Sequence, residues 1–149
     1  MQYRVVLLMS LLLLKGFFSN AQEGATWKIV LNKKAILTAS GQEDTLNNKL
    51  QLKKSDLANN NIFKIEYNEP KNSTTKGWVR TIVIMDTTSA VVVQQDSVSL
   101  LQLYNKDLMK LLWSRQKVNV YTWVKPLDPG MAAAIRIRRF HLCSIELIE

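Results

Sequence analysis

The stretch Ile-Phe-Lys-Ile-Glu-Tyr, residues 62–67, decides the fold class because apolar and charged side chains alternate along it at every step. Successive side chains of a β-strand point to opposite faces of the sheet. Phe63, Ile65 and Tyr67 therefore share one face, and the two charged residues share the other. The pattern predicts a half-buried strand with one face on a hydrophobic core.

Similar segments lie on both sides of this stretch, separated by short runs rich in Asn, Gly, Pro, Ser and Thr. Such spacing is typical of a sandwich or barrel rather than of βαβ units. We therefore expect a mainly β protein, a single antiparallel β-sandwich of about eight or nine short strands. The predicted strands cover residues 27–31, 35–38, 50–53, 62–67, 78–85, 90–93, 98–103 and 118–125, and the C-terminal segment; a turn is expected at 94–96.

The C-terminal segment, Ala133–Ile148, is the longest of these. Isoleucine and arginine alternate over residues 135–138, but the phase slips at Arg139 and again before Ile145. A slip in a two-residue period indicates a β-bulge. The segment predicts one long strand, or two strands joined by a bulge, after a turn at Pro126–Gly130.

One segment has a helical period instead. Leu108, Leu111 and Leu112 have the spacing of one helix face, Asn105 suits an N-cap, and Arg115 suits the last turn. We expect one short helix at about 105–115, between the predicted strands 98–103 and 118–125. Because a helix of this length is marginal alone, its leucines must pack on the sheets.

The first 21 residues have the three parts of a secretory signal: Arg4, an apolar stretch at 5–14, and Ser19-Asn20-Ala21 as a cleavage site. The apolar stretch is too short to cross a membrane core of about 30 Å. We expect a signal peptide at 1–21, a single domain at 22–149, a periplasmic or extracellular location, and no transmembrane anchor.

Basic residues outnumber acidic ones, with 20 Lys+Arg against 12 Asp+Glu and a formal charge of +8. Such a charge attracts acidic polymers, anionic membrane surfaces or nucleic acid, or simply keeps a protein soluble. Because an exported protein rarely meets nucleic acid, we expect a protein, a glycan or an acidic polymer as partner, and no nucleic acid.

His141 and Cys143 are the only residues of their kinds. Two residues apart on a regular strand, they share a face and could begin a metal site, but Arg139 on that face repels a cation. No Gly-x-Ser-x-Gly motif gives the histidine a nucleophile to serve. We expect a core histidine and a buried cysteine, with no metal, no cofactor and no catalytic residue; a disulfide-linked dimer requires an exposed thiol.

Paired carboxylates can hydrolyse glycosidic bonds, and Glu66, Glu69, Asp86 and Asp96 are the candidates. Only Glu66 lies inside a predicted strand, on the face opposite the core; the others lie in predicted loops or turns. A hydrolase that acts on carbohydrate or an envelope polymer through Glu66 or Glu69 therefore stays an alternative to a binding protein.

Aromatic and basic residues meet in the segment 118–125. If its valines point inward, Tyr121, Trp123 and Lys125 point outward together, and such a face binds sugars, peptides or a partner protein. The alternative is that the rings cover the edges of the core. A second basic face, Arg136 and Arg138, suits carboxylate or phosphate, or is simply a solvated strand that resists aggregation.

The signal end Asn20-Ala21-Gln22, the short strands and the closing run at 136–143 (Arg-Ile-Arg-Arg-Phe-His-Leu-Cys) resemble small exported bacterial β-sandwich proteins of unknown function. The resemblance covers only the general layout and implies no site residue. We expect a non-enzymatic binding or interaction module. A structural subunit that assembles by strand addition through its C-terminal strand is a further alternative.

Overall fold

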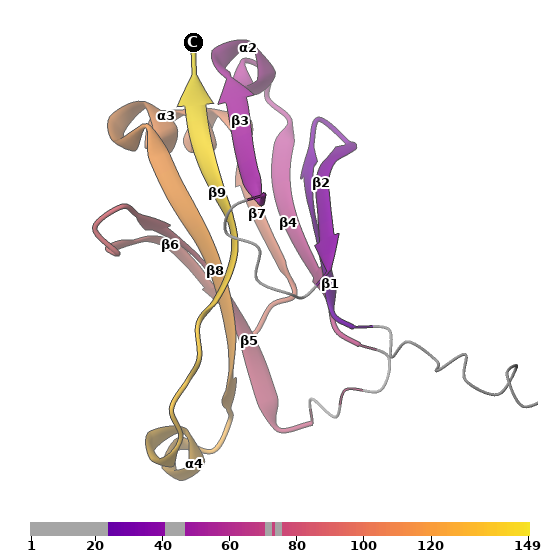
Figure 1. Ribbon diagram of the computed structural model, residues 1–149, viewed down its shortest axis with the longest axis vertical. Helices are drawn as coiled ribbons and strands as arrows, with labels where there is room; N and C mark the ends of the chain where they lie inside the picture. The colour runs from indigo at the N-terminus through magenta and orange to yellow at the C-terminus, as the bar shows by residue number, and fades with distance from the viewer. Residues whose placement is uncertain (1–23, 41–46, 71–72, 74–75) are drawn as a thin grey trace, which may run out of the picture.

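The computed structural model describes residues 24–40, 47–70, 73 and 76–149; the predicted signal peptide lies outside these ranges. The fold is mainly β, as expected, with nine strands and three helices among the described residues. Strands β2, β1, β4 and β7 form one sheet in that order, and β3, β9, β8, β5 and β6 form the other. Figure 1 shows both sheets.

The four-stranded sheet contains β1 (Thr26–Leu31), β2 (Lys34–Ser40), β4 (Ile62–Asn68) and β7 (Leu100–Tyr104). The five-stranded sheet contains β3 (Lys49–Lys53), β5 (Trp78–Asp86), β6 (Val91–Asp96), β8 (Lys117–Pro126) and β9 (Phe140–Ile148). The helices are α2 (Lys54–Leu57), α3 (Asn105–Arg115) and α4 (Pro129–Ala134).

The alternation that predicted β4 is confirmed: Phe63, Ile65 and Tyr67 are buried, and the charged residues between them are half-buried. One hydrophobic core includes these side chains, Trp27 and Ile29 of β1, and residues of the five-stranded sheet. The core side chains from that second sheet are Leu50, Leu52, Ile82, Ile84, Val118, Val120, Leu142, Cys143 and Ile145. Both sheets therefore contribute to a single core.

The predicted helix at 105–115 is confirmed, and Leu108, Leu111 and Leu112 are buried. The predicted N-cap is wrong: Tyr104 occupies that position, and Asn105 is fully buried inside the first turn. The Asn105 side-chain amide donates to Asn32 Oδ1 (2.8 Å) and Asn59 Oδ1 (2.7 Å). Asn105 therefore joins the helix start to two loops rather than capping its own helix.

The expectation of purely antiparallel sheets is wrong for one pair, because β3 and β9 are parallel. Parallel neighbours need a long connection rather than a hairpin, and these two strands are far apart in the sequence. The expected turn at 94–96 is also wrong, since β6 continues to Asp96 and pairs with β5. Strand β9 pairs with β8 from Phe140 to Glu146 and with β3 from Ser144 to Ile148, so the part that lies between the two strands has no free edge for strand addition.

The largest correction concerns Ala133–Ile148. Residues 129–134 form α4 and residues 135–139 are unpaired, so the strand begins only at Phe140. Asp128 explains the helix, since its side chain accepts a hydrogen bond from the Met131 N–H (2.8 Å), and Pro129 takes a first-turn position that proline favours. Three alanines then favour helix over strand.

Candidate functional site

The predicted surface of Tyr121, Trp123 and Lys125 lies on the face of β8 that points away from the core. Val118 and Val120 belong to the core, and the three predicted residues alternate with that inward side. All three are half-buried rather than fully exposed. The Tyr121 ring meets the His141 ring edge-on, with 5.2 Å between centroids. The inward valines are confirmed, and the outward rings are partly covered by neighbours.

Arginine reaches this surface from the segment that follows α4. Arg136, Arg138 and Arg139 are exposed, but they do not lie on a strand, which corrects the expected Arg136/Arg138 strand face. Arg139 is the residue in contact, with its guanidinium carbon 5.7 Å from the centre of the Trp123 ring. A cation at this distance is attracted by the ring face. The structure thus pairs Trp123 with Arg139, which sequence reasoning had not placed in the site.

Lys125 has an acidic neighbour on the same sheet. The pKa of Asp96 is lowered, first by the hydrogen bond from the Thr81 hydroxyl (2.6 Å) and also by the charge of Lys125. Part of the Lys125 charge is therefore balanced within the protein. The three exposed arginines, Arg136, Arg138 and Arg139, add further positive charge to this surface.

These residues form what we call the aromatic-basic surface: Tyr121, Trp123, Lys125, Arg136, Arg138 and Arg139. Its residues come from the second half of β8 and from the β8–β9 connection, residues 127–139. The connection leaves the body of the protein at the end marked by α4, opposite the end that carries α2, α3 and the C-terminus (Figure 1).

The two glutamates of the hydrolase alternative do not act as a pair. Glu66 lies on the outward side of β4 and forms an ion pair with Lys28 (2.8 Å). Glu69 forms an ion pair with Arg80 Nε (2.5 Å), whose guanidinium also lies 3.8 Å from the centre of the Tyr67 ring. Each carboxylate therefore has a separate cationic partner in a different place, which gives no support to a shared reaction centre.

His141 and Cys143 are not on one face as their spacing predicted. The register of β8 and β9 shifts between Val120, which pairs with Cys143, and Tyr121, which pairs with His141. The extra residue in β9 is a bulge of the predicted kind, and it turns Cys143 into the core while His141 packs on Tyr121. Burial raises the pKa of the Cys143 thiol. The thiol is fully buried, so it is not available for a disulfide-linked dimer.

A second basic region lies on the outward side of the four-stranded sheet. Lys28, Lys33 and Lys64 line a groove of about 550 Å³ together with Glu66 and two asparagines. Glu66 balances Lys28 directly. The groove provides a natural comparison for the aromatic-basic surface, because its three lysines match the three arginines of that surface in number and lie on a different part of the protein.

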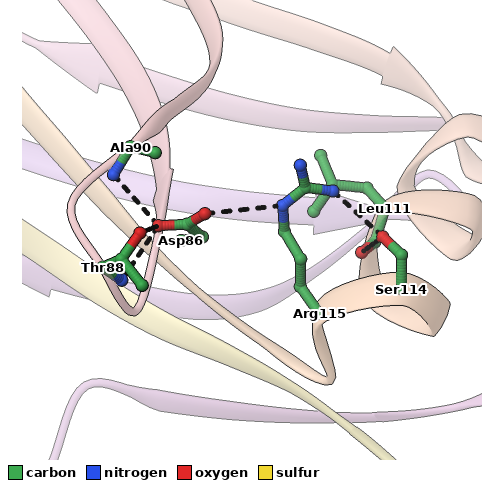
Figure 2. A network of polar contacts seen from close by, with 6 residues as sticks. All are labelled: Asp86, Thr88, Ala90, Leu111, Ser114 and Arg115. Carbon is green, nitrogen blue, oxygen red and sulfur yellow. Dashed lines mark hydrogen bonds and ion pairs between the residues drawn. The ribbon is translucent and has the colours of Figure 1, made fainter.

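Asp86 joins the β5–β6 hairpin to the last turn of α3, as Figure 2 shows. Its Oδ1 accepts hydrogen bonds from the backbone N–H groups of Thr88 (2.9 Å) and Ala90 (3.0 Å) and from the Thr88 hydroxyl (2.7 Å). Its Oδ2 lies 3.8 Å from Arg115 Nε. The Thr88 hydroxyl, the Ala90 N–H and the Arg115 charge all lower the pKa of Asp86. Asp86 has a structural role, and not the catalytic one considered from sequence.

We expect Asp86→Asn to be less stable than wild type at neutral pH and to converge with it in acid. A folded-state pKa below the unfolded value gives stability that is present above the unfolded pKa and is lost as the pH falls through the folded pKa. Urea unfolding of both proteins from neutral pH to below about 3 measures this. Asp107→Asn, whose exposed ion pair with Lys110 is 3.9 Å long, is the control. A constant Asp86→Asn difference at all pH values would contradict the account.

No protein-family model and no curated protein matches the chain. Among the residues that the structure describes, no helix is long and apolar enough to cross a membrane. Within the same ranges, no three His, Cys, Asp or Glu side chains come together as metal ligands.

Proposed function

We propose that this is an exported β-sandwich protein that works as a non-enzymatic binding module and contacts an anionic partner through the aromatic-basic surface. Two sheets that share one core support the sandwich. The charged, apolar and small-residue segments of residues 1–21 support export. The location is periplasmic or extracellular.

The contact of Arg139 with Trp123 is the observation that carries the proposal. A tryptophan offers a large apolar area with a polar N–H, and an arginine offers a planar set of donors that fits carboxylate, sulfate or phosphate groups. Their combination on one surface binds an anionic group with more geometric definition than scattered lysines do. Arg136 and Arg138 add charge beside it, and the segment that carries them is exposed.

The position of Trp123 also supports binding over core packing. Its ring is half-buried and is not part of the hydrophobic core. A side chain in this position can lose its contacts without opening a cavity inside the fold. Truncation should therefore affect binding more than stability.

We expect Trp123→Ala to weaken the binding of labelled poly-L-glutamate at least about fivefold, while its free energy of unfolding falls by no more than about 1–2 kcal/mol. Fluorescence anisotropy measures the first quantity and urea unfolding the second. Trp113→Ala is the matched control, because Trp113 is 62% exposed on α3 at the other end of the molecule. A loss of about 3–5 kcal/mol in Trp123→Ala would place this ring in the core instead, and unchanged binding would remove it from the site.

A further inference from the structure

Exposed apolar side chains gather on the β8–β9 connection. Leu127 is 64% exposed, Met131 51%, and Ile135 and Ile137 37% each. The other large apolar side chains that the structure shows as exposed are spread singly over β4, β5, β6, β7 and α3. Scattered exposure of that kind is normal, but four such side chains within residues 127–139 form a concentrated apolar surface.

The same connection is basic. Ile135 and Ile137 alternate with Arg136 and Arg138, and Arg139 follows them. Asp128 is the one acidic residue of the connection, and its carboxylate accepts the Met131 N–H at the start of α4. The connection therefore presents apolar side chains and arginines together, with its single carboxylate engaged in a helix cap.

Core packing does not explain the apolar residues of this connection. No residue of α4 is buried, and all of residues 135–139 are exposed. The connection also lies at one extremity of the molecule (Figure 1). Exposure of apolar side chains to water costs free energy, so binding to a partner that covers them is favourable.

We propose that the β8–β9 connection docks the protein on an anionic lipid bilayer, with Leu127, Met131, Ile135 and Ile137 in the interface and the arginines on the headgroups. This names the partner of the surface in the proposed function and rests on that function. Two weak signals together, apolar insertion and basic charge, are what stable attachment to a membrane surface requires. Arginine stems lie along apolar surface while their charged ends reach the headgroups.

Shape favours a bilayer over a folded protein as the occupant. Four cavities on the described part of the molecule are lined by residues outside 127–139. The connection lies at one extremity of the molecule (Figure 1), and none of these four cavities lies in it. A fluid interface accepts such an extremity without matching its shape, and its negative charge complements Arg136, Arg138 and Arg139.

The test uses protein recovered after export, verified by mass to lack residues 1–21, so that the apolar stretch at 5–14 is absent. Sedimentation compares vesicles of phosphatidylcholine alone with vesicles that contain about 30% phosphatidylglycerol. We expect binding to the anionic vesicles that is at least about tenfold tighter and that weakens as salt is added. The double variant Ile135→Ser/Ile137→Ser should lower that binding at least about tenfold but leave poly-L-glutamate binding unchanged.

A site-specific probe reports which end of the protein enters the interface. Met131→Cys accepts a polarity-sensitive thiol dye, while the native Cys143 is fully buried and does not compete. Lys110→Cys on α3 is the control at the opposite end, where the side chain is 79% exposed. We expect a blue shift on anionic vesicles for the dye at 131 and none for the dye at 110.

The outcomes separate the two proposals. Poly-L-glutamate binding that depends on the arginines, without any binding to anionic vesicles, overturns the membrane inference and leaves the proposed function standing. Absence of binding to both overturns both. Vesicle binding that survives the isoleucine double variant, or equal blue shifts at 131 and 110, shows that the connection is not the docking element and also overturns the inference.

Discussion

Trp27→Ala is expected to lower the free energy of unfolding by about 3–5 kcal/mol, because the change removes a large side chain from the centre of the core. Trp27 is fully buried, and it pairs with Tyr67 of β4 on one side and Ala39 of β2 on the other. The strands on both sides of Trp27 are held in place by the hydrogen bonds of the sheet, so they cannot move in to fill the cavity that alanine leaves. Denaturant unfolding of wild type and variant measures the loss.

Trp27→Phe separates the contribution of ring packing to stability from the effect of the buried indole N–H. That N–H has no hydrogen-bond partner among the residues that the structure describes, so its removal relieves an unsatisfied polar group and offsets part of the lost volume. We expect a loss of no more than about 1.5 kcal/mol for this variant. Trp113 is exposed, and its ring centre lies 4.5 Å from Lys54 Nζ. We expect Trp113→Ala to lower the free energy of unfolding by less than about 1 kcal/mol. Equal losses for Trp27→Ala and Trp113→Ala would contradict the described core.

Local sequence patterns were sufficient to predict the elements that pack one face against the core. The period of two in residues 62–67 predicted β4, and the spacing of Leu108, Leu111 and Leu112 predicted α3. In both cases one face of the element meets the core, so the pattern in the sequence and the burial in the structure have the same cause. The inward direction of Val118 and Val120 was predicted for the same reason.

The alternation in residues 135–138 misled the prediction because a strand also needs a partner. These residues are extended at Ile135 (φ −109°, ψ 148°) but lie outside both sheets. The competing signal was the capping group Asp128 with Pro129 and the alanines after it, which are local features that the sequence does display. Isoleucine and arginine in alternation therefore indicated a chain segment with two different sides, but not a hydrogen-bonded strand.

The site depends on long-range features that a single sequence does not reveal. Arg139 reaches Trp123 only because the β8–β9 pairing returns the chain alongside β8 after the connection. The bulge that separates His141 from Cys143 was expected in kind, but its position follows from the pairing of Val120 with Cys143. The parallel contact of β3 with β9 joins residues that are far apart in the sequence, which no local pattern specifies.

A charge-matched comparison gives the second large expected effect. In one variant Arg136, Arg138 and Arg139 become glutamine; in the other Lys28, Lys33 and Lys64, the basic residues of the groove, become glutamine. Both lose three positive charges, so long-range attraction falls equally. Only the first variant removes the donors beside Trp123, so we expect at least about tenfold weaker poly-L-glutamate binding for the arginine variant and less than about threefold for the lysine variant.

The measurement that tests the central claim most directly is therefore the ratio of these two affinities at one salt concentration, with urea unfolding to verify that both variants are folded. We expect the arginine variant to bind at least about threefold more weakly than the lysine variant. Equal losses in the two variants would mean that only the net charge of the protein matters, and would contradict a binding surface around Trp123 and Arg139.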